Sequence, residues 1–259
     1  MMRTMKNGWA AAPALLMLLT GSAMARTIVI DGREAAPAAD NDVWQVEVSP
    51  YLWAASLRGT VGVGRLGGRI HAPFHDTVHD LDMAFMGHVA AEKQGLGLFL
   101  DGQFLDADRD LDVAGGALSA DVRLRSGWAS LGAYYRTWRW EGLCVAPMAG
   151  LHWSEMALRL RADGESLSDT VRWTVPFFGV RADYDLSPDW QLVTAADIGA
   201  WGRRYTLQGQ VYAGYRLQAG TVPLQVRIGY RALHQDARDG DVRWDMTQFG
   251  PVVGLSASF

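Results

Sequence analysis

The feature that most constrains this chain is a period of two in its apolar residues. In the closing segment 249–259 alternate residues are apolar and share one face, and those between them are mostly small or polar: Phe249, Pro251, Val253, Leu255, Ala257 and Phe259. Such alternation is typical of a β-strand with one apolar face. It recurs clearly at 44–57, 96–105, 190–201, 207–217 and 222–233, and more weakly at 84–93, 117–137, 143–158 and 171–186. These segments predict ten strands.

The connections between these strands alternate in length. Short links fall at 93–95, 138–142, 187–189 and 218–221, and longer polar segments fall at 58–83, 107–116, 159–170 and 234–244. Short turns on one rim and long loops on the other are typical of outer-membrane barrels. We therefore expect an all-β chain, a closed antiparallel transmembrane β-barrel of about ten strands. A hairpin within 60–80 would make twelve strands, and a wrongly assigned pair at the short link 202–206 would make eight.

Aromatic residues on the predicted outward face fall into two groups. One group lies near the periplasmic rim: Trp44, Tyr135, Tyr184, Trp190, Tyr215 and Phe259. The other lies about eight to ten residues further along the strands, roughly 20–25 Å away: Phe104, Trp153, Tyr230 and Phe249. This spacing matches the two aromatic girdles of an outer-membrane barrel. A soluble β-sandwich is the competing fold, but its outer faces would be polar.

The N-terminus predicts export. Residues 1–25 hold a basic start with Arg3 and Lys6, an apolar run at 9–19 and a small-residue exit ending at Ala25, which is the plan of a secretory signal peptide. A retained membrane anchor is the alternative, but the apolar run is too short to span a bilayer as a helix. We expect 26–43 to be a periplasmic lead and 44–259 to form the barrel in the cell outer membrane.

Composition excludes some functions. The formal net charge is −4, and removal of the leader makes the chain more acidic, so no nucleic-acid partner is expected. The single cysteine, Cys144, cannot form an internal disulfide, and we expect it to act as a small packing residue. No cofactor motif stands in a suitable context, and we expect no cofactor and no metal.

The chain resembles a group of uncharacterised proteobacterial outer-membrane β-barrel proteins. The residues that carry the resemblance span most of 44–259: Trp44, Glu47, Pro50–Trp53, Phe74, Asp76, Leu81–Ala84, Asp197–Gly202, Gly229–Arg231, Gly250–Leu255 and Phe259. The resemblance implies the barrel fold, and Phe259 looks like the carboxy-terminal signal read by the barrel-assembly machinery. It implies no chemistry. The partners expected are outer-membrane lipid, lipopolysaccharide and that machinery, with the oligomeric state left open.

The predicted inward faces collect charge in balanced numbers. Arginine suits such a site because its planar fork forms bidentate bonds with carboxylates. The interior of a barrel this narrow is largely filled by side chains. A lumen charge network that plugs the barrel is one interpretation, and a narrow polar path for small solutes is the other. The residues are Glu47, Glu92, Asp101, Arg136, Arg181, Asp183, Asp197, Arg216, Arg227 and Arg231.

Three further motifs are weighed as sites of chemistry. His152 and Ser154 stand two apart on one predicted strand face, so they suggest a lipid or peptide hydrolase, although no third orienting group is identifiable. His71, His75 and His79 recur every fourth residue, but Pro73 argues against the helix that would align them for Zn²⁺.

Alternating acids form the third motif: Asp106, Asp108, Asp110 and Asp112. On a strand end they would share a side and attract Ca²⁺ or Mg²⁺ at the lipopolysaccharide surface, which would make the protein a surface binding module. The sequence favours a non-enzymatic barrel, structural or a narrow pore, over the hydrolase and the binding module.

Overall fold

A computed structural model describes residues 42–63, 66–74, 81–113, 118–162, 165–219, 222–239 and 242–259. The predicted signal peptide and nearly all of the predicted lead lie outside these residues. No helix among the described residues is long and apolar enough to span a bilayer.

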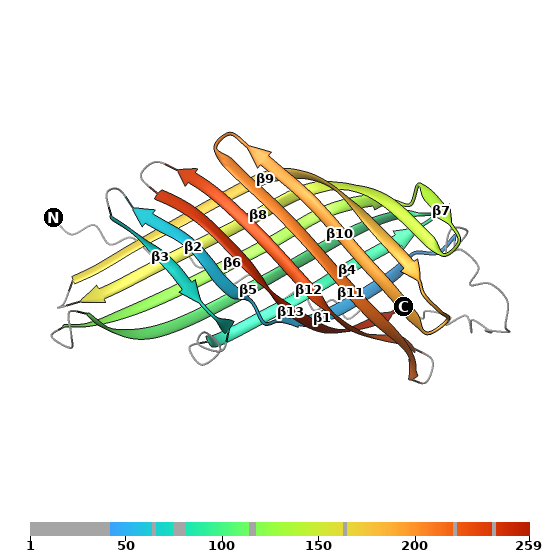
Figure 1. Cartoon of the computed structure of the whole chain (residues 1–259), viewed down its shortest axis with the longest axis horizontal. Coiled ribbons are helices and arrows are strands. Elements are labelled where there is room, and N and C mark those ends of the chain that lie inside the picture. The colour runs from blue at the N-terminus through green and yellow to red at the C-terminus, as the bar shows by residue number, and fades with distance from the viewer. Residues whose placement is uncertain are drawn as a thin grey trace.

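The described chain forms thirteen strands in one sheet. Their bounds are β1 Gln45–Trp53, β2 Ser56–Val63, β3 Leu66–Ala72, β4 Leu81–Lys93, β5 Leu96–Val113, β6 Leu118–Tyr135, β7 Trp138–Trp140, β8 Leu143–Ala162, β9 Glu165–Asp185, β10 Trp190–Trp201, β11 Arg204–Ala219, β12 Val222–Asp239 and β13 Val242–Ser258. From β4 to β13 the wall strands pair antiparallel and in chain order, with the short β7 beside β8, and they slope across the barrel (Figure 1).

The barrel closes with ten strands, which confirms the predicted fold class. The first of the ten strands of the barrel wall consists of two segments, β1 and β2, which both pair with β13. β1 also pairs with β4 and so seals the sheet. The predicted hairpin within 60–80 exists as β2–β3, but β3 pairs only with β2 and the barrel does not become twelve-stranded.

The register fixes the slope of the strands. A path that starts at Gln45 and steps from each residue to its direct partner on the next strand goes once around the barrel and arrives at Leu57. Leu57 is twelve residues beyond Gln45 on the same strand of the wall, which β1 and β2 form together. With a rise of ~3.3 Å per residue and a strand spacing of ~4.8 Å, this stagger implies a tilt of about 40°. Figure 1 shows the strands sloping across the long axis of the barrel.

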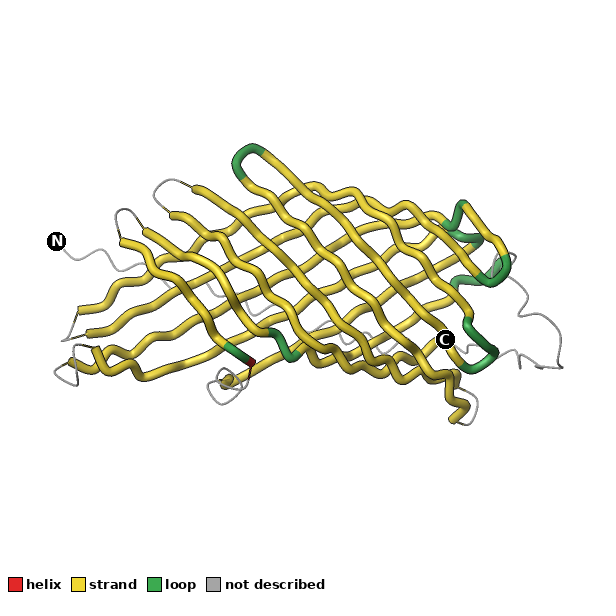
Figure 2. The backbone as a smooth tube through the Cα atoms, viewed as in Figure 1, coloured by secondary structure: helices red, strands yellow, loops and turns green. Residues whose placement is uncertain are grey.

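The described connections at the end of the barrel that holds the C-terminus are tight turns. Gln94 and Gly95 have φ of 51° and 80°, which is the left-handed pair that a two-residue hairpin requires. Short turns of this kind gather at the end that also holds the C-terminus, so this end is periplasmic (Figure 2).

The long loops predicted at the other end are mostly wrong. β5 and β6 run to 113 and from 118, and β8 and β9 run to 162 and from 165. Strands β12 and β13 likewise continue into the predicted loop 234–244, and β2 and β3 occupy 58–63 and 66–72 of the predicted loop 58–83. The hydrophobic alternation fades there because a strand above the membrane has no lipid to face, so its backbone pairing continues without the sequence signal.

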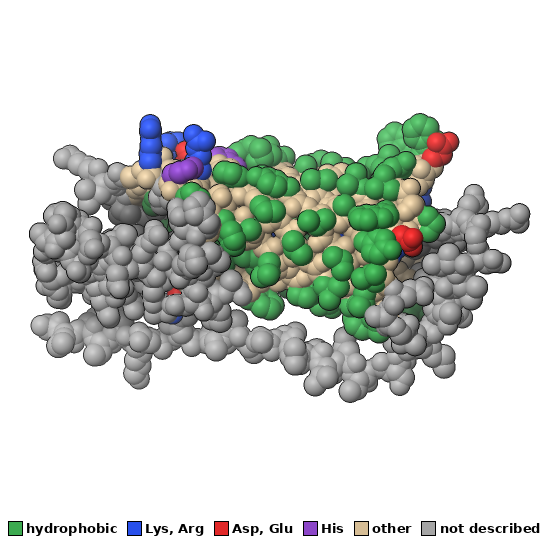
Figure 3. Space-filling model, turned by 60° about the horizontal axis from the view of Figure 1, so that its bottom comes forward, with side chains coloured by type: hydrophobic (Ala, Val, Ile, Leu, Met, Phe, Trp, Pro, Cys, Tyr) green, Lys and Arg blue, Asp and Glu red, His purple; other side chains and the backbone are tan. Residues whose placement is uncertain are grey.

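The outer surface carries an apolar belt, seen as green in Figure 3. The outward aromatics of the periplasmic rim are exposed: Trp44, Tyr135, Tyr184, Trp190, Tyr215 and Phe259. Trp153 and Tyr230 of the upper group are exposed too, whereas Phe104 and Phe249 are half-buried among their neighbours. Exposed leucine, valine and isoleucine lie between the two groups, as expected of a surface that meets hydrocarbon.

Candidate functional site

The periplasmic part of the interior holds a compact layer of ion pairs. Arg136, which follows β6, bonds to Glu92 of β4 at 2.7 Å and to Asp183 of β9 at 3.1 Å. Arg181 bonds to the same Asp183 at 2.8 Å. The hydroxyl of Tyr134 donates to Glu92 at 2.7 Å. Each carboxylate therefore has at least two donors, as burial of a charge requires.

A second pair lies across the same layer. Both terminal nitrogens of Arg227 on β12 bond to the two carboxylate oxygens of Glu47 on β1, at 2.7 and 2.6 Å. Such a bidentate contact fixes the planes of both groups. Ser49 donates to Glu47 at 3.1 Å and lies 2.6 Å from Ser256. The seam between β1 and β13 is therefore bonded on its inner face.

The centre of the barrel is organised around Arg231. Its side chain is 1 % exposed and donates to Asp101 at 2.7 Å and to Gln208 at 3.0 Å. Tyr51 donates to Asp101 at 2.7 Å and accepts from Arg231 at 2.9 Å. The guanidinium carbon also lies 4.5 Å from the ring centroid of Trp128, close enough for a cation–π contact.

A serine, a histidine and an aspartate form a hydrogen-bonded chain beside this cluster. Ser130 Oγ lies 2.5 Å from Nδ1 of His152, and Nε2 of His152 lies 2.7 Å from Asp197. Gln208 donates to the other oxygen of Asp197 at 3.3 Å and joins this chain to Arg231. Ser130 and His152 are directly opposite on β6 and β8, so the register alone brings them together.

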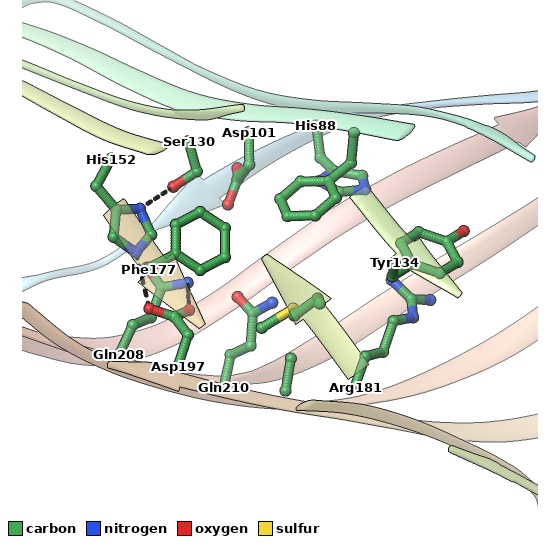
Figure 4. Close-up of a pocket in the computed structure, with 13 residues that line it drawn as sticks. His88, Asp101, Ser130, Tyr134, His152, Phe177, Arg181, Asp197, Gln208 and Gln210 are labelled. Carbon is green, nitrogen blue, oxygen red and sulfur yellow. Dashed lines mark hydrogen bonds and ion pairs between the residues drawn. The ribbon is translucent and has the colours of Figure 1, made fainter. Parts of the chain in front are cut away.

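This chain lines a cavity in the middle of the barrel (Figure 4). His152 stacks on Phe177 with ring centroids 4.1 Å apart. The cavity has a volume of about 30 Å³. A few waters would fill it, and its walls offer them polar partners, including His88, Asp101 and Gln210.

Above this cavity, toward the extracellular end, the interior becomes apolar. One buried cluster joins Trp53, Met86, Trp128, Leu233 and Val252. A second lies further up and joins Trp173, Val175, Ala237, Trp244 and Met246. The indole N–H groups of the four tryptophans in these two clusters have no hydrogen-bond partner among the described residues.

The structure brings together most of the predicted lumen charges, but in separate groups. One group joins Glu92, Arg136, Arg181 and Asp183, a second is the pair of Glu47 and Arg227, and a third connects Asp101 and Arg231 to Asp197. Arg216 lies apart from all three. It bonds at the periplasmic rim to Asp185 and to the carbonyl of Pro188, because its place near the end of its strand puts it below the interior.

The predicted pair of His152 and Ser154 does not form a hydrogen bond. Both side chains are buried, as the alternation predicts, but Ser154 accepts from Gln235 at 2.8 Å. The partners of His152 are Ser130 and Asp197 instead. Residues two apart on a strand stand further from each other than a directly opposite pair, which explains the exchange.

The other two motifs are only partly described. His75 and His79 lie outside the described residues, and His71 is an exposed residue of β3. The four acids 106–112 lie in β5 rather than in a loop, and Asp106 is bonded to Arg125 at 2.9 Å. No group of three or more His, Cys, Asp or Glu side chains that could hold a metal ion occurs among the described residues.

Sequence reasoning missed several residues of the interior. Ser130, Gln208 and Trp128 face inward by the same alternation, but their partners depend on register between strands. The turn at 136–142, which contains the short strand β7, sets the register of β6 against β8. No local pattern in the sequence specifies that offset.

Comparison with known proteins gives a fold and no family. No family model and no curated protein matches the chain. Among solved structures, the outer-membrane protease OmpT of Escherichia coli aligns over 85 % of this chain and 98 % of its own, with 11 % identity and a TM-score of 0.53. The attachment invasion locus protein Ail of Yersinia pestis aligns over 83 % of this chain and 98 % of its own, with 13 % identity and a TM-score of 0.34.

The closed ten-strand wall, the apolar belt and the likeness to OmpT in fold define the class. The chain is a β-barrel protein of the bacterial outer membrane, which confirms the location expected from the sequence. The resemblance to an uncharacterised proteobacterial family stays a prediction.

Proposed function

We propose that the protein is a non-enzymatic, structural barrel whose lumen is plugged and does not conduct. The observation that carries this proposal is the burial of interior side chains at successive levels. Arg231, Leu233 and His152 are each at most 1 % exposed to water. A continuous aqueous path needs side chains that water touches, and these three side chains are closed to water.

Two kinds of barrier stand in series along the axis. Paired charges near the periplasm would have to separate before an ion passed, which costs several kcal/mol for a buried pair. The apolar layer around Trp173 and Trp244 would have to become wet, which hydrophobic constrictions oppose. Either barrier alone favours a closed barrel over a narrow pore.

Planar-bilayer recording of the refolded full chain tests this proposal. The expected result is a silent bilayer across voltage and pH, and discrete conductance steps from the wild type would overturn it. The variant W173A/W244A opens the apolar layer and should pass small ions if that layer is a barrier. The matched variant W138A/W140A, in the periplasmic turn, removes the same side chains outside the lumen and should stay silent.

A hydrolase is the second candidate, and one observation favours it. In the chain Ser130–His152–Asp197 a hydroxyl contacts an imidazole whose other nitrogen contacts a carboxylate. Ser130 Oγ would attack an ester carbonyl, its proton would pass to His152 Nδ1, and the imidazole would return that proton to the leaving alkoxide. A water molecule, deprotonated by His152, would then attack the acyl-serine carbonyl, and the proton would return to Ser130 Oγ as the fatty acid leaves. This function ranks second because the cavity is too narrow for more than a few waters.

Release of fatty acid from a short-chain ester tests the second candidate. S130A should abolish release, and S154A should leave it unchanged, because Ser154 bonds to Gln235 rather than to the histidine. No release by the wild type, or equal release by S130A, ends this hypothesis.

A further inference from the structure

The outward surface beyond the apolar belt carries a cluster of basic side chains, called here the basic face. Its members come from the hairpin β2–β3, the turn before β11, and strands β12 and β13, and all are exposed: Arg58, Arg69, His71, Arg203, Arg238 and Arg243. Figure 3 shows blue and purple side chains gathered at one end of the green belt.

The strand register places these residues side by side. Arg238 and Arg243 are directly opposite each other on β12 and β13. Arg58 is directly opposite Thr247 of β13 on one side and His71 of β3 on the other. Like charges directly opposite in a sheet repel, so the opposed guanidinium groups of Arg238 and Arg243 favour any anion that lies near both.

The acids nearby neutralise this surface only in part. Asp236 lies 3.6 Å from Arg238, and Asp245 lies 3.8 Å from Arg243, near the limit for an ion pair. Among the described residues, Arg58, Arg69 and Arg203 have neither an ion pair nor a hydrogen bond through their side chains. Among the side chains that the structure describes, the basic face thus holds five arginines and two acids, a surplus of positive charge that can bind anions.

An exposed arginine on another part of the barrel wall is bonded to an acid of the protein itself. Arg172 of β9 is also exposed, but it forms two bonds with Glu155 of β8, at 2.8 and 3.1 Å. Its charge is matched within the protein. A surplus of positive charge is therefore a property of the face at β2–β3 and β12–β13, not of every described strand above the belt.

The distance of the basic face from the apolar belt indicates which part of the membrane it contacts. Along β13 the outward residues are apolar from Phe259 to Phe249, an axial distance of about 25 Å at the strand rise and tilt given above. Thr247, Asp245 and Arg243 follow on the same face. Along β12 the outward residues change in the same way, from Tyr230 to Asp236 and Arg238. Arg58, which is opposite Thr247, therefore stands roughly 5 Å above the belt, at the outer-leaflet headgroups, and Arg243 stands roughly 15 Å above it, at the height of a glycolipid's sugars.

We propose that the basic face binds the phosphate groups of a phosphorylated glycolipid in the outer leaflet. Guanidinium groups match phosphate oxygens with two parallel hydrogen bonds. Clusters of four or more basic residues beside a membrane are typical of anionic lipid recognition. A glycolipid with two phosphates would bridge Arg58 on one side and the opposed pair Arg238–Arg243 on the other. This inference is independent of whether the lumen conducts.

Binding of lipopolysaccharide to the detergent-solubilised full chain tests the proposal. Native mass spectrometry should retain phosphorylated lipopolysaccharide on the wild type, and the variant R58Q/R238Q/R243Q should bind at least about tenfold more weakly. The matched variant R172Q removes an arginine outside the basic face and should bind as the wild type does. Unchanged heat-dependent gel mobility establishes that each variant is folded.

Two further arms separate the outcomes. D236N/D245N removes the competing carboxylates and should bind more tightly than the wild type. Phosphatase-treated lipopolysaccharide should bind more weakly to the wild type. Equal binding by the triple variant, equal binding of the dephosphorylated lipid, or equal binding of phosphatidylglycerol micelles would each overturn the proposal.

Discussion

The periplasmic and extracellular halves of the lumen are filled by different kinds of side chain. Strand β9 crosses both, and its inward residues run from Trp173 and Val175 through Phe177 to Arg181 and Asp183. Near the periplasm, the buried polar groups are bonded to one another. Toward the cell surface, two apolar clusters fill much of the lumen, and the indole N–H groups of their tryptophans lack partners among the described residues, although Gln235 and Ser154 are bonded to each other.

The difference concerns how a polar group contributes to stability. A buried charge that is bonded to its partners lowers the stability of the fold only slightly. Removing that charge leaves its partners buried without a bond, and this destabilises the fold strongly. An unpartnered indole N–H already carries its desolvation cost, so its removal loses no hydrogen bond. The two halves should therefore respond oppositely to substitutions that delete polar atoms.

The largest effect is expected at Arg231. Replacement of this residue by Met keeps the packing volume but leaves Asp101 buried with Tyr51 as its remaining partner. We expect a loss of about 3–5 kcal/mol in the free energy of unfolding. Urea unfolding in detergent micelles, followed by tryptophan fluorescence, measures it.

The double variant D101N/R231M is the control for this prediction. It removes both charges together, so it should be more stable than R231M alone. A double variant as unstable as R231M would mean that packing around the arginine, rather than the orphaned carboxylate, is what matters. Bonded charges would then not be what distinguishes the stability of the periplasmic half of the lumen from that of the extracellular half.

A smaller effect is expected at Tyr51. Its hydroxyl donates to Asp101 and accepts from Arg231, and Tyr51→Phe removes only this oxygen. We expect a loss of about 1–3 kcal/mol, because two charged groups each lose a bond without a change of shape. The same urea titration measures it, and a change below ~0.5 kcal/mol would show that the central cluster bonds less tightly than its distances imply.

The sequence predicts features that are set within a single strand, and it does not predict contacts that depend on the offset between strands. Alternation within a strand places Asp101, Arg231 and Asp197 inside, because that signal is local. The contact of Ser130 with His152 needs the offset between two strands, which no local pattern specifies. Arg216 faces inward by alternation but bonds at the rim, because alternation gives a face and not a height.

The extracellular half is the part that the sequence predicts least. Strands β8 and β9 continue well beyond the belt, where neither face meets lipid, and the predicted loops 107–116 and 159–170 are largely strand. Trp173 and Trp244 lie inside the barrel, yet an apolar residue that faces inward carries the signal expected of an outward one. Only the closed register shows which side of the wall they occupy.

The smallest effect is expected for Trp173→Phe, which is the matched counterpart of Tyr51→Phe. Both deletions remove one polar hydrogen from a buried aromatic residue, but the indole N–H of Trp173 has no partner among the described residues. Loss of its desolvation cost offsets the small cavity that the shorter ring leaves. We expect the free energy of unfolding to change by less than ~1 kcal/mol in the same urea titration. A loss as large as that of Tyr51→Phe would mean that the indole is bonded in the folded protein, and the two halves of the lumen would then be stabilised by the same principle.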